Sequence, residues 1–247
     1  MSSLSASIIE IPDITATDRC AMFQLYQRYY GGTSEAMFFS DLADKDYALL
    51  LRDDEDQVGG FSTLALLDDD TPHKMRALFS GDTIVDRAFW GQQRLAFNWI
   101  RFAGQLKAQH PEVPLYWFLI VKGHRTYRYL STFSIDYYPH HANPTPPATN
   151  DLMTRLARAR FGGHFDAGSG LVKFPSSRGH LQPEWARVPP QDAHKPEVRY
   201  FLERNPNYVS GDELVCLTEL TPSNLRPLAK RIFLQGMAGP PVSQGGV

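Results

Sequence analysis

Apolar side chains recur at helical spacing near the start of the chain and at strand-like spacing soon afterwards. Residues 16–30 predict an amphipathic helix that ends at a pair of glycines, and residues 34–42 predict a second, shorter helix. The apolar face of the first helix consists of Met22, Leu25, Tyr26 and Tyr29. The stretch YALLLRDDEDQVGGFSTLALL then indicates two strands joined by an acidic turn over residues 53–57.

The middle of the chain predicts a strand, a helix and another strand. Residues 76–85 are the third predicted strand, and a run of helix formers begins at Gln92. The segment LYWFLIV, residues 115–121, is apolar without alternation, which is typical of a central parallel strand covered on both faces. Gly123 ends this strand, and the short helix HRTYRYLSTF is expected to follow.

The remainder of the chain is less regular. A proline-rich loop over 139–150 precedes a predicted helix, DLMTRLARARFG, and an irregular region extends to about residue 195. A helix, the strand ELVCLTEL and a last helix then follow. We therefore expect an α/β (α+β) fold with a mixed, twisted sheet flanked by helices and an irregular C-terminal insertion. The predicted parts are an N-terminal arm (1–15), a core (16–138), a C-terminal extension that completes the sheet and is a candidate for the substrate site (139–235), and a disordered tail (236–247).

Composition argues against several classes of function. Of the 247 residues, 43% are hydrophobic and 21% are charged, and the net charge is −2. A nucleic-acid partner is therefore not expected, because such proteins carry a basic face. No apolar run approaches the roughly 18 residues of a membrane span, and the first residues lack the pattern of a secretory signal. The chain has only two cysteines, Cys20 and Cys216, so a disulfide framework is not expected. We therefore expect a reduced, cytoplasmic protein.

The segment VDRAFWGQQRL, residues 85–95, carries the most specific chemical signal. A strand ends there in a tight turn that contains a glycine, and helix formers follow at once. The N–H groups at a helix start can hold phosphate oxygens, so the segment is a candidate phosphate cradle. A purely structural strand, turn and helix is the alternative.

The order of elements around this segment resembles the GNAT superfamily of acyl-CoA-dependent N-acyltransferases. The resemblance covers residues 16–138 and a last strand at 213–220. In that family, a strand with pantetheine-binding amides runs into a turn with the pattern V-x-P-x-x-R-G-x-G-x-G/A, which opens a helix.

Two residues of this chain match the pattern, and others depart from it. Val85 and Gly91 match. Trp90 stands where the family has Arg or Gln, Gln93 replaces a glycine, and Leu95 replaces the last small residue. Glycines at such a turn let the backbone approach a pyrophosphate closely, so side chains at positions 93 and 95 have to point away from it.

The resemblance implies acetyl-CoA or a longer acyl-CoA as donor and a small-molecule amine as acceptor. Arg87 and Arg94 would supply the positive charge that position 90 lacks, and His124 stands near an asparagine of the family. The full set of implied cofactor-binding residues is Ile84, Val85, Arg87, Gly91, Gln92, Gln93, Arg94 and His124.

Acyl transfer also needs a group that takes a proton from the amine. Asp82 lies in the third strand, where members of the family often place an acidic base or a residue that orients water. The period of two along a strand puts Ser80, Asp82 and Ile84 on one face. An exposed, solvated aspartate is the alternative interpretation.

A second group has to protonate the departing thiolate. The helix HRTYRYLSTF resembles the family segment N-x-x-A-x-x-L-Y-x-x-x-G-F, whose tyrosine does this, and it offers Tyr127 and Tyr129. These two residues lie about 200° apart around a helix, so only one of them can face the sulfur. The alternative is that one tyrosine packs in the core while the other is exposed.

No metal is expected, because the pairs His140-His141 and His164-x-Asp166 lack a suitably spaced third ligand. Two other functions stay open. One is an enzyme that takes acyl chains from an acyl carrier protein, as in N-acyl amino acid and acyl-homoserine lactone synthases, and the other is a GNAT-like binding module without catalysis. A homodimer is compatible with the sequence, and the acceptor is not predicted.

Overall fold

The computed structural model describes residues 4–69 and 74–240, which form two compact units. The first unit contains the described residues of Met1–Arg28, Ser34–Trp117 and Leu220–Val247, and the second contains Tyr29–Thr33 and Phe118–Glu219. Residues 241–247 of the predicted tail lie outside the described residues, as do residues 1–3 and 70–73.

Most elements of the first unit are those that the apolar pattern predicts. In chain order they are β1 (Ser5–Glu10), η1 (Ile11–Asp13), α1 (Ala16–Gln27), α2 (Glu35–Ala43), β3 (Tyr47–Arg52), β4 (Val58–Asp69), β5 (Met75–Val85), η2 (Arg87–Phe89), α3 (Arg94–Gln109), the start of β6 (Leu115–Val121) and α9 (Pro227–Met237). Strands β1, β3, β4 and β5 are antiparallel neighbours in that order. Strand β6 lies next to β5, and α3 between them makes the crossover that parallel strands need.

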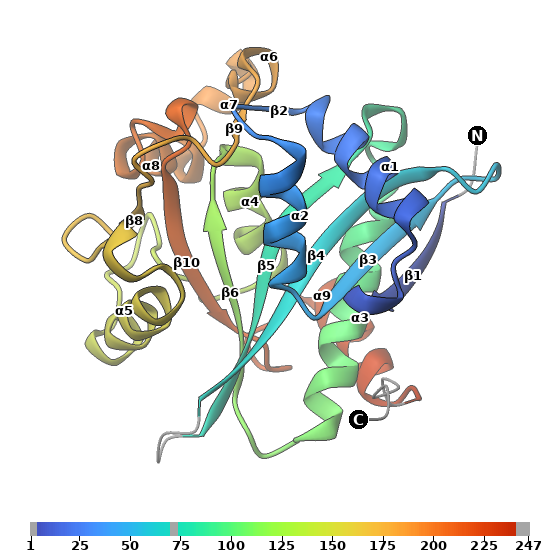
Figure 1. Cartoon of the computed structure of the whole chain (residues 1–247). Helices are drawn as coiled ribbons and strands as arrows, with labels where there is room; N and C mark the ends of the chain where they lie inside the picture. Colours follow the sequence, from blue (N-terminus) through green and yellow to red (C-terminus); the bar gives the residue numbers. More distant parts are fainter. Residues whose placement is uncertain (1–3, 70–73, 241–247) are drawn as a thin grey trace. The chain divides into compact units, whose positions relative to one another are not determined.

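Helices cover both faces of the sheet in the first unit, as Figure 1 shows. On one face, Phe38 of α2 packs edge-on against Phe61 of β4, with ring centroids 6.1 Å apart. On the other face, Phe102 of α3 packs against Tyr47 of β3 at 5.2 Å. Phe61 pairs with Leu50, which is three residues from Tyr47, so the two contacts lie on opposite faces by the period of two.

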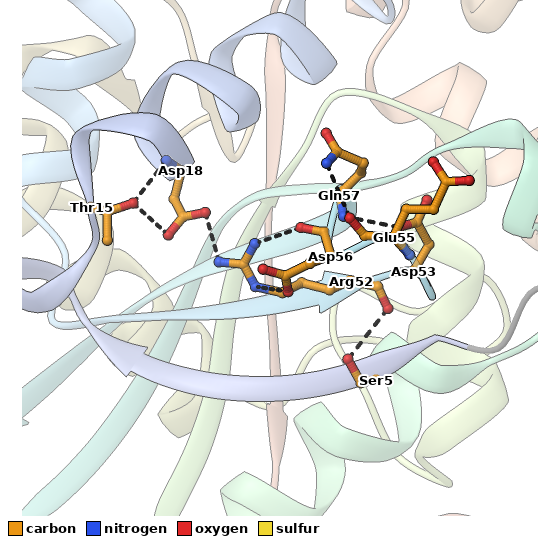
Figure 2. A network of polar contacts seen from close by, with 8 residues as sticks. All are labelled: Ser5, Thr15, Asp18, Arg52, Asp53, Glu55, Asp56 and Gln57. Carbon is orange, nitrogen blue, oxygen red and sulfur yellow. Dashed lines mark hydrogen bonds and ion pairs between the residues drawn. The ribbon is translucent and has the colours of Figure 1, made fainter.

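A polar network fastens the start of α1 to the end of β3 (Figure 2). Thr15 caps the helix by accepting the N–H of Asp18 at 3.1 Å, and its hydroxyl donates to the Asp18 carboxylate at 2.7 Å. Arg52 of β3 donates to the other oxygen of that carboxylate at 2.6 Å. Burial would raise the pKa of Asp18, but the hydrogen bonds from Arg52 and Thr15 outweigh it and the pKa lies below its usual value.

Helix α9 packs on α3 so closely that each helix approaches the backbone of the other. A Cβ added to Gly104 of α3 would collide with the carbonyl oxygen of Phe233, and one added to Gly236 of α9 would collide with the carbonyl oxygen of Arg101. The two glycines therefore let the helices approach more closely than any other residue would allow.

The second unit holds the remaining elements. In chain order they are β2 (Tyr30–Gly31), the end of β6, α4 (His124–Phe133), α5 (Pro147–Phe161), η3 (Gly162–His164), β7 (Phe165–Asp166), β8 (Leu171–Val172), β9 (His180–Leu181), α6 (Pro183–Ala186), α7 (Pro190–Ala193), α8 (Pro196–Arg204), η4 (Tyr208–Ser210) and β10 (Glu213–Glu219). The sheet continues here in the order β6-β10-β8-β7, and β2 pairs separately with β9.

The prediction of a mixed α/β sheet flanked by helices is confirmed, and the sheet has eight strands within residues 4–69 and 74–240. Two segments contain structure that the sequence pattern did not predict. Residues 5–10, placed in an N-terminal arm, form an edge strand on β3. The irregular region up to residue 195 contains several strands of two residues and short helices, and elements of this length leave no readable period.

Candidate functional site

Strand β5 contains a β-bulge at the predicted catalytic aspartate. Pairing with β4 shifts between Ser62 and Leu64, so that Gly81 and Asp82 together stand opposite Thr63. A Cβ at position 81 would lie only 2.5 Å from Thr63 Oγ1. The bulge therefore requires glycine there, and it interrupts the pairing of Asp82 with the neighbouring strand.

The bulge changes which side chains share a face of β5. Ser80 and Thr83 pair with β4 residues that are two apart and so lie on one face, whereas Phe79 and Ile84 lie on the other. The prediction that Ser80, Asp82 and Ile84 share a face is wrong, because one extra residue reverses the alternation. Ile84 is buried, and Asp82 is half-buried within the bulge.

The turn after β5 is fixed by several contacts within the first unit. The Asp86 carboxylate accepts the N–H of Ala88 at 3.0 Å and pairs with Arg28 at 2.9 Å. The Phe89 ring lies against Gly59, where an added Cβ would approach it to 2.7 Å. The Trp90 indole N–H donates to the carbonyl of Val85 at 2.8 Å. The carbonyl oxygen of Val85 therefore accepts a hydrogen bond from within the protein.

Helix α3 begins at Arg94, two residues later than the sequence predicts, because the two residues at positive φ come first. Gly91 has φ 93° and Gln93 has φ 53° in the left-handed region, which is unusual for a side chain larger than Asn. The N–H of Gln92 donates to the carbonyl of Phe89 at 3.3 Å. The amide of Gln92, one of those expected to hold phosphate, therefore already donates a hydrogen bond within the turn.

The N–H groups of the first turn of α3 have no acceptor within the helix. Gln93 at the N-cap supplies no side-chain hydrogen bond to them in the described structure. Arg87 and Arg94 are both exposed at this end of the helix. The helix dipole, the uncapped amides and the two guanidinium groups together favour an anion here.

His124 begins α4 in the second unit and is almost completely buried, with 1% of its surface exposed. Burial, and then the charge of Arg125, lower its pKa to about 4. Its Nε2 atom has no hydrogen-bond partner among the described residues. The imidazole is therefore neutral near pH 7, and one of its ring nitrogens is buried without a hydrogen-bond partner among the described residues.

The two tyrosines of α4 have different surroundings. Tyr127 is fully buried, and its hydroxyl donates to the carbonyl of Pro139 at 2.7 Å. Tyr129 is 44% exposed and its ring stacks on Phe133 at 5.6 Å. Burial raises the pKa of both phenols, so both are protonated at neutral pH, and only Tyr129 is exposed enough to meet a substrate.

The register of α4 adds a further residue that the sequence reasoning missed. If His124 takes the place of the asparagine in the family segment, then Leu130 falls on the leucine and Ser131 on the tyrosine. The Ser131 hydroxyl donates to the carbonyl of Arg128 at 3.0 Å. In this register Ser131 stands where the family segment has its tyrosine. Counting seven residues from His124 in the sequence is enough to find this position.

The predicted site residues fall into two groups, each contiguous within one unit. The first unit holds the strand end and turn, from Asp82 to Arg94, and the second holds His124, Tyr127 and Tyr129 on α4. Among residues 4–69 and 74–240, no three His, Cys, Asp or Glu side chains are placed to hold a metal ion. No helix in the same residues is long and apolar enough to cross a membrane.

The fold defines a class, a mixed α/β architecture in which a sheet is combined with flanking helices. Similar solved structures include a GNAT family N-acetyltransferase from Escherichia coli in complex with CoA, which is 18% identical over 60% of this chain and 78% of its own, with a TM-score of 0.39. An acyl-CoA N-acyltransferase from Pseudomonas aeruginosa is 20% identical over 53% of this chain and 88% of its own, with a TM-score of 0.38.

An acetyltransferase from Trypanosoma brucei is 11% identical over 58% of this chain and 96% of its own, also with a TM-score of 0.38. No family model and no curated protein matches the sequence.

Proposed function

We propose that the chain is an N-acyltransferase that moves an acyl group from acetyl-CoA or a longer acyl-CoA to a small-molecule amine. The observation that carries this proposal is the turn from Gly91 to Gln93. Its two residues at positive φ come shortly after η2 and open α3, whose first amides receive no side-chain cap in the described structure, beside two exposed arginines. This arrangement suits the pyrophosphate of a CoA thioester.

The binding contribution would come from the amides after the turn, with charge from Arg94 and Arg87. The N–H groups of residues 93 and 94 would donate to pyrophosphate oxygens, and the dipole of α3 would add to the attraction. Ile84 and Val85 would lie along the pantetheine arm at the end of β5.

The reaction forms a bond between the amine nitrogen and the acyl carbon and breaks the bond from that carbon to sulfur. The amine gives up a proton, for which we propose Asp82 as acceptor, directly or through water. The thiolate takes up a proton, for which we propose Tyr129 as donor. Tyr127 stays a second candidate by sequence, although its hydroxyl is committed to Pro139.

One observation favours a second function, a CoA-binding module without transfer. Tyr127 is buried and hydrogen-bonded, and Ser131 occupies the position of the family's tyrosine in one register. An acyl carrier protein as donor is the other alternative. Both are outcomes of the experiment below.

Calorimetry with CoA tests the proposal through the Arg94→Glu variant. Reversing the charge at the helix start should weaken binding by about 1.5–3 kcal/mol, the contribution of a charge-assisted contact. Arg101→Glu makes the same charge change on α3 two turns further along, where the side chain lies near Asn98, and should bind CoA nearly as the wild type does.

Equal affinity of the wild type and Arg94→Glu would rule out the assignment of this turn. An assay of thioester consumption with a panel of amines separates transfer from binding alone. Stabilisation by an acylated carrier protein, without any effect of CoA, would favour the carrier-dependent enzyme.

A further inference from the structure

The side chain of His140 accepts two hydrogen bonds from the backbone of the loop that follows it. The N–H groups of Ala142 and Asn143 donate to its Nδ1 atom at 3.0 and 3.2 Å. A ring nitrogen that accepts hydrogen bonds carries a lone pair and no proton, so the proton of the neutral imidazole lies on Nε2. A second proton can bind only at Nδ1. The atom that holds the loop is therefore also the basic atom of the side chain.

Aromatic neighbours hold the ring of His140 in place. Its centroid lies 4.5 Å from that of Tyr137 and 4.4 Å from that of His141. Tyr137 is itself buried, and its hydroxyl lies 3.4 Å from Nδ1 of His141. His140 is half-buried, whereas residues 141–144 are exposed. The ring is thus the anchored partner, and the loop is the partner that can move away.

The chain is fixed directly before His140 and is rich in proline after it. Tyr138 and Leu217 exchange two backbone hydrogen bonds of 2.8 Å. Residues 143–147, NPTPP, contain three prolines, which have no N–H to donate. The two amides that His140 accepts are the last ones before the first of these prolines. Loss of their bonds to the ring would therefore release the segment up to the start of α5 at Pro147.

Protonation of the ring conflicts with this closed arrangement. A proton on Nδ1 replaces the lone pair with a donor, which would face two N–H groups that are also donors. Burial, and then the neighbouring His141, lower the pKa of His140 below its usual value of 6.5, and Asp136 acts in the opposite direction. Tyr137 is the other titratable group in contact with the ring. Burial, His141 and the two amides therefore all favour the neutral ring while the loop is closed.

We propose that His140 is a pH-sensitive switch for the loop between Pro139 and α5. The neutral ring closes the loop over residues 140–143, and the binding of one proton at Nδ1 breaks both hydrogen bonds and opens it. Because the ring binds a proton more readily once the loop is open, closure is favoured above pH 6.5 and is lost progressively as the pH falls below this value. All of these residues lie in the second unit, and the inference does not depend on the proposed function.

Nuclear magnetic resonance of the full chain, from about pH 8 to about pH 5, tests this inference. At the upper end, the imidazole nitrogen signals of His140 should show a proton on Nε2 and none on Nδ1. The amide signals of Ala142 and Asn143 should shift together with these ring signals as the pH falls. Below pH 6.5 the ratio of open to closed loops should rise by up to about tenfold per pH unit.

The His140→Phe variant keeps an aromatic ring at this position and removes the acceptor. Near neutral pH, the amides of Ala142 and Asn143 should then give the signals that they give in the wild type at acidic pH, and these signals should not titrate. His194→Phe is the control, because His194 is exposed in the same unit and its replacement should leave the titration unchanged.

A proton on Nδ1 at the upper end of the pH range, or amides that do not follow the ring, would overturn the inference. Titration that persists in His140→Phe would do the same, since it would assign the effect to another group such as His141. None of these outcomes involves an acyl donor, so the proposed function can fail or stand independently of them.

Discussion

Tyr127 and Tyr129 lie on nearly opposite sides of α4, and their contacts separate the roles that the sequence left open. Tyr127 packs among Tyr137, Tyr200 and Phe201, with ring centroids about 6 Å away. Its hydroxyl satisfies a buried carbonyl. Tyr129 has solvent on one side and Phe133 on the other. At the scale of single residues, the first stabilises the unit and the second is the candidate acid.

Phenylalanine substitutions distinguish these roles. Tyr129→Phe should lower turnover roughly 100- to 10,000-fold, as expected for loss of a positioned acid, and should leave acyl-CoA affinity nearly unchanged. Tyr127→Phe should keep turnover but lower the free energy of unfolding by about 1–3 kcal/mol, because a buried carbonyl loses its donor. Steady-state kinetics and urea denaturation measure the two effects. Full activity in Tyr129→Phe would assign the proton to water or to another group.

Among the elements, α3 connects the candidate site to the rest of the first unit. Its N-terminus forms the proposed cradle, and its apolar face packs on the sheet, where Trp99 lies 4.7 Å from Trp117. Its other side is pressed against α9 through Gly104 and Gly236. The last helix of the chain therefore fixes the position of the helix start, although the two are far apart in sequence.

Gly104→Ala should lower the free energy of unfolding by about 1–3 kcal/mol, the range for overpacking. Alanine is intrinsically better than glycine within a helix by up to about 1 kcal/mol, so a loss would show that the contact with Phe233 dominates. Gly163→Ala is the matched control, since no atom lies within 4 Å of its Cβ position. Stabilisation of Gly104→Ala in chemical denaturation would contradict the close packing of α3 and α9.

For the whole molecule, each of the two units of the chain holds some of the candidate residues. The cradle and Asp82 belong to the first unit, and His124 and Tyr129 belong to the second. His124 also makes the stability of the protein depend on pH, because a buried neutral imidazole resists protonation. The charged groups that act on it are Arg125, Asp192, Arg128 and Lys195, all within the second unit.

The free energy of unfolding should fall as the pH decreases from 6.5 to 4. In this window the unfolded chain binds a proton at His124 with its ordinary pKa of 6.5, whereas the folded chain, with a pKa of about 4, does not. The His124 contribution should amount to roughly 1–3 kcal/mol across the window.

Urea denaturation across this pH range measures the slope, and His124→Asn should remove part of it. The exposed His194 provides the control, because His194→Asn should leave the slope as it is in the wild type. Equal slopes in the wild type and His124→Asn would show that the buried imidazole is not the cause.

The sequence by itself determined the order of the main helices and strands. Apolar periodicity located α1 and α3, because each is long enough to show a helical period, and an apolar run without alternation located β6. The glycine between the third strand and the following helix indicated a candidate phosphate cradle, with a purely structural turn as the alternative.

Only the tertiary structure decided the details on which the chemistry depends. The bulge reverses the face of Ile84 because register is set by the neighbouring strand. The hydroxyl of Tyr127 donates to a carbonyl twelve residues away, which the sequence does not indicate, and Trp90 is held by a backbone acceptor in β5. Such contacts join positions whose pairing leaves no mark in a single sequence, so local pattern could name the candidates but could not assign their roles.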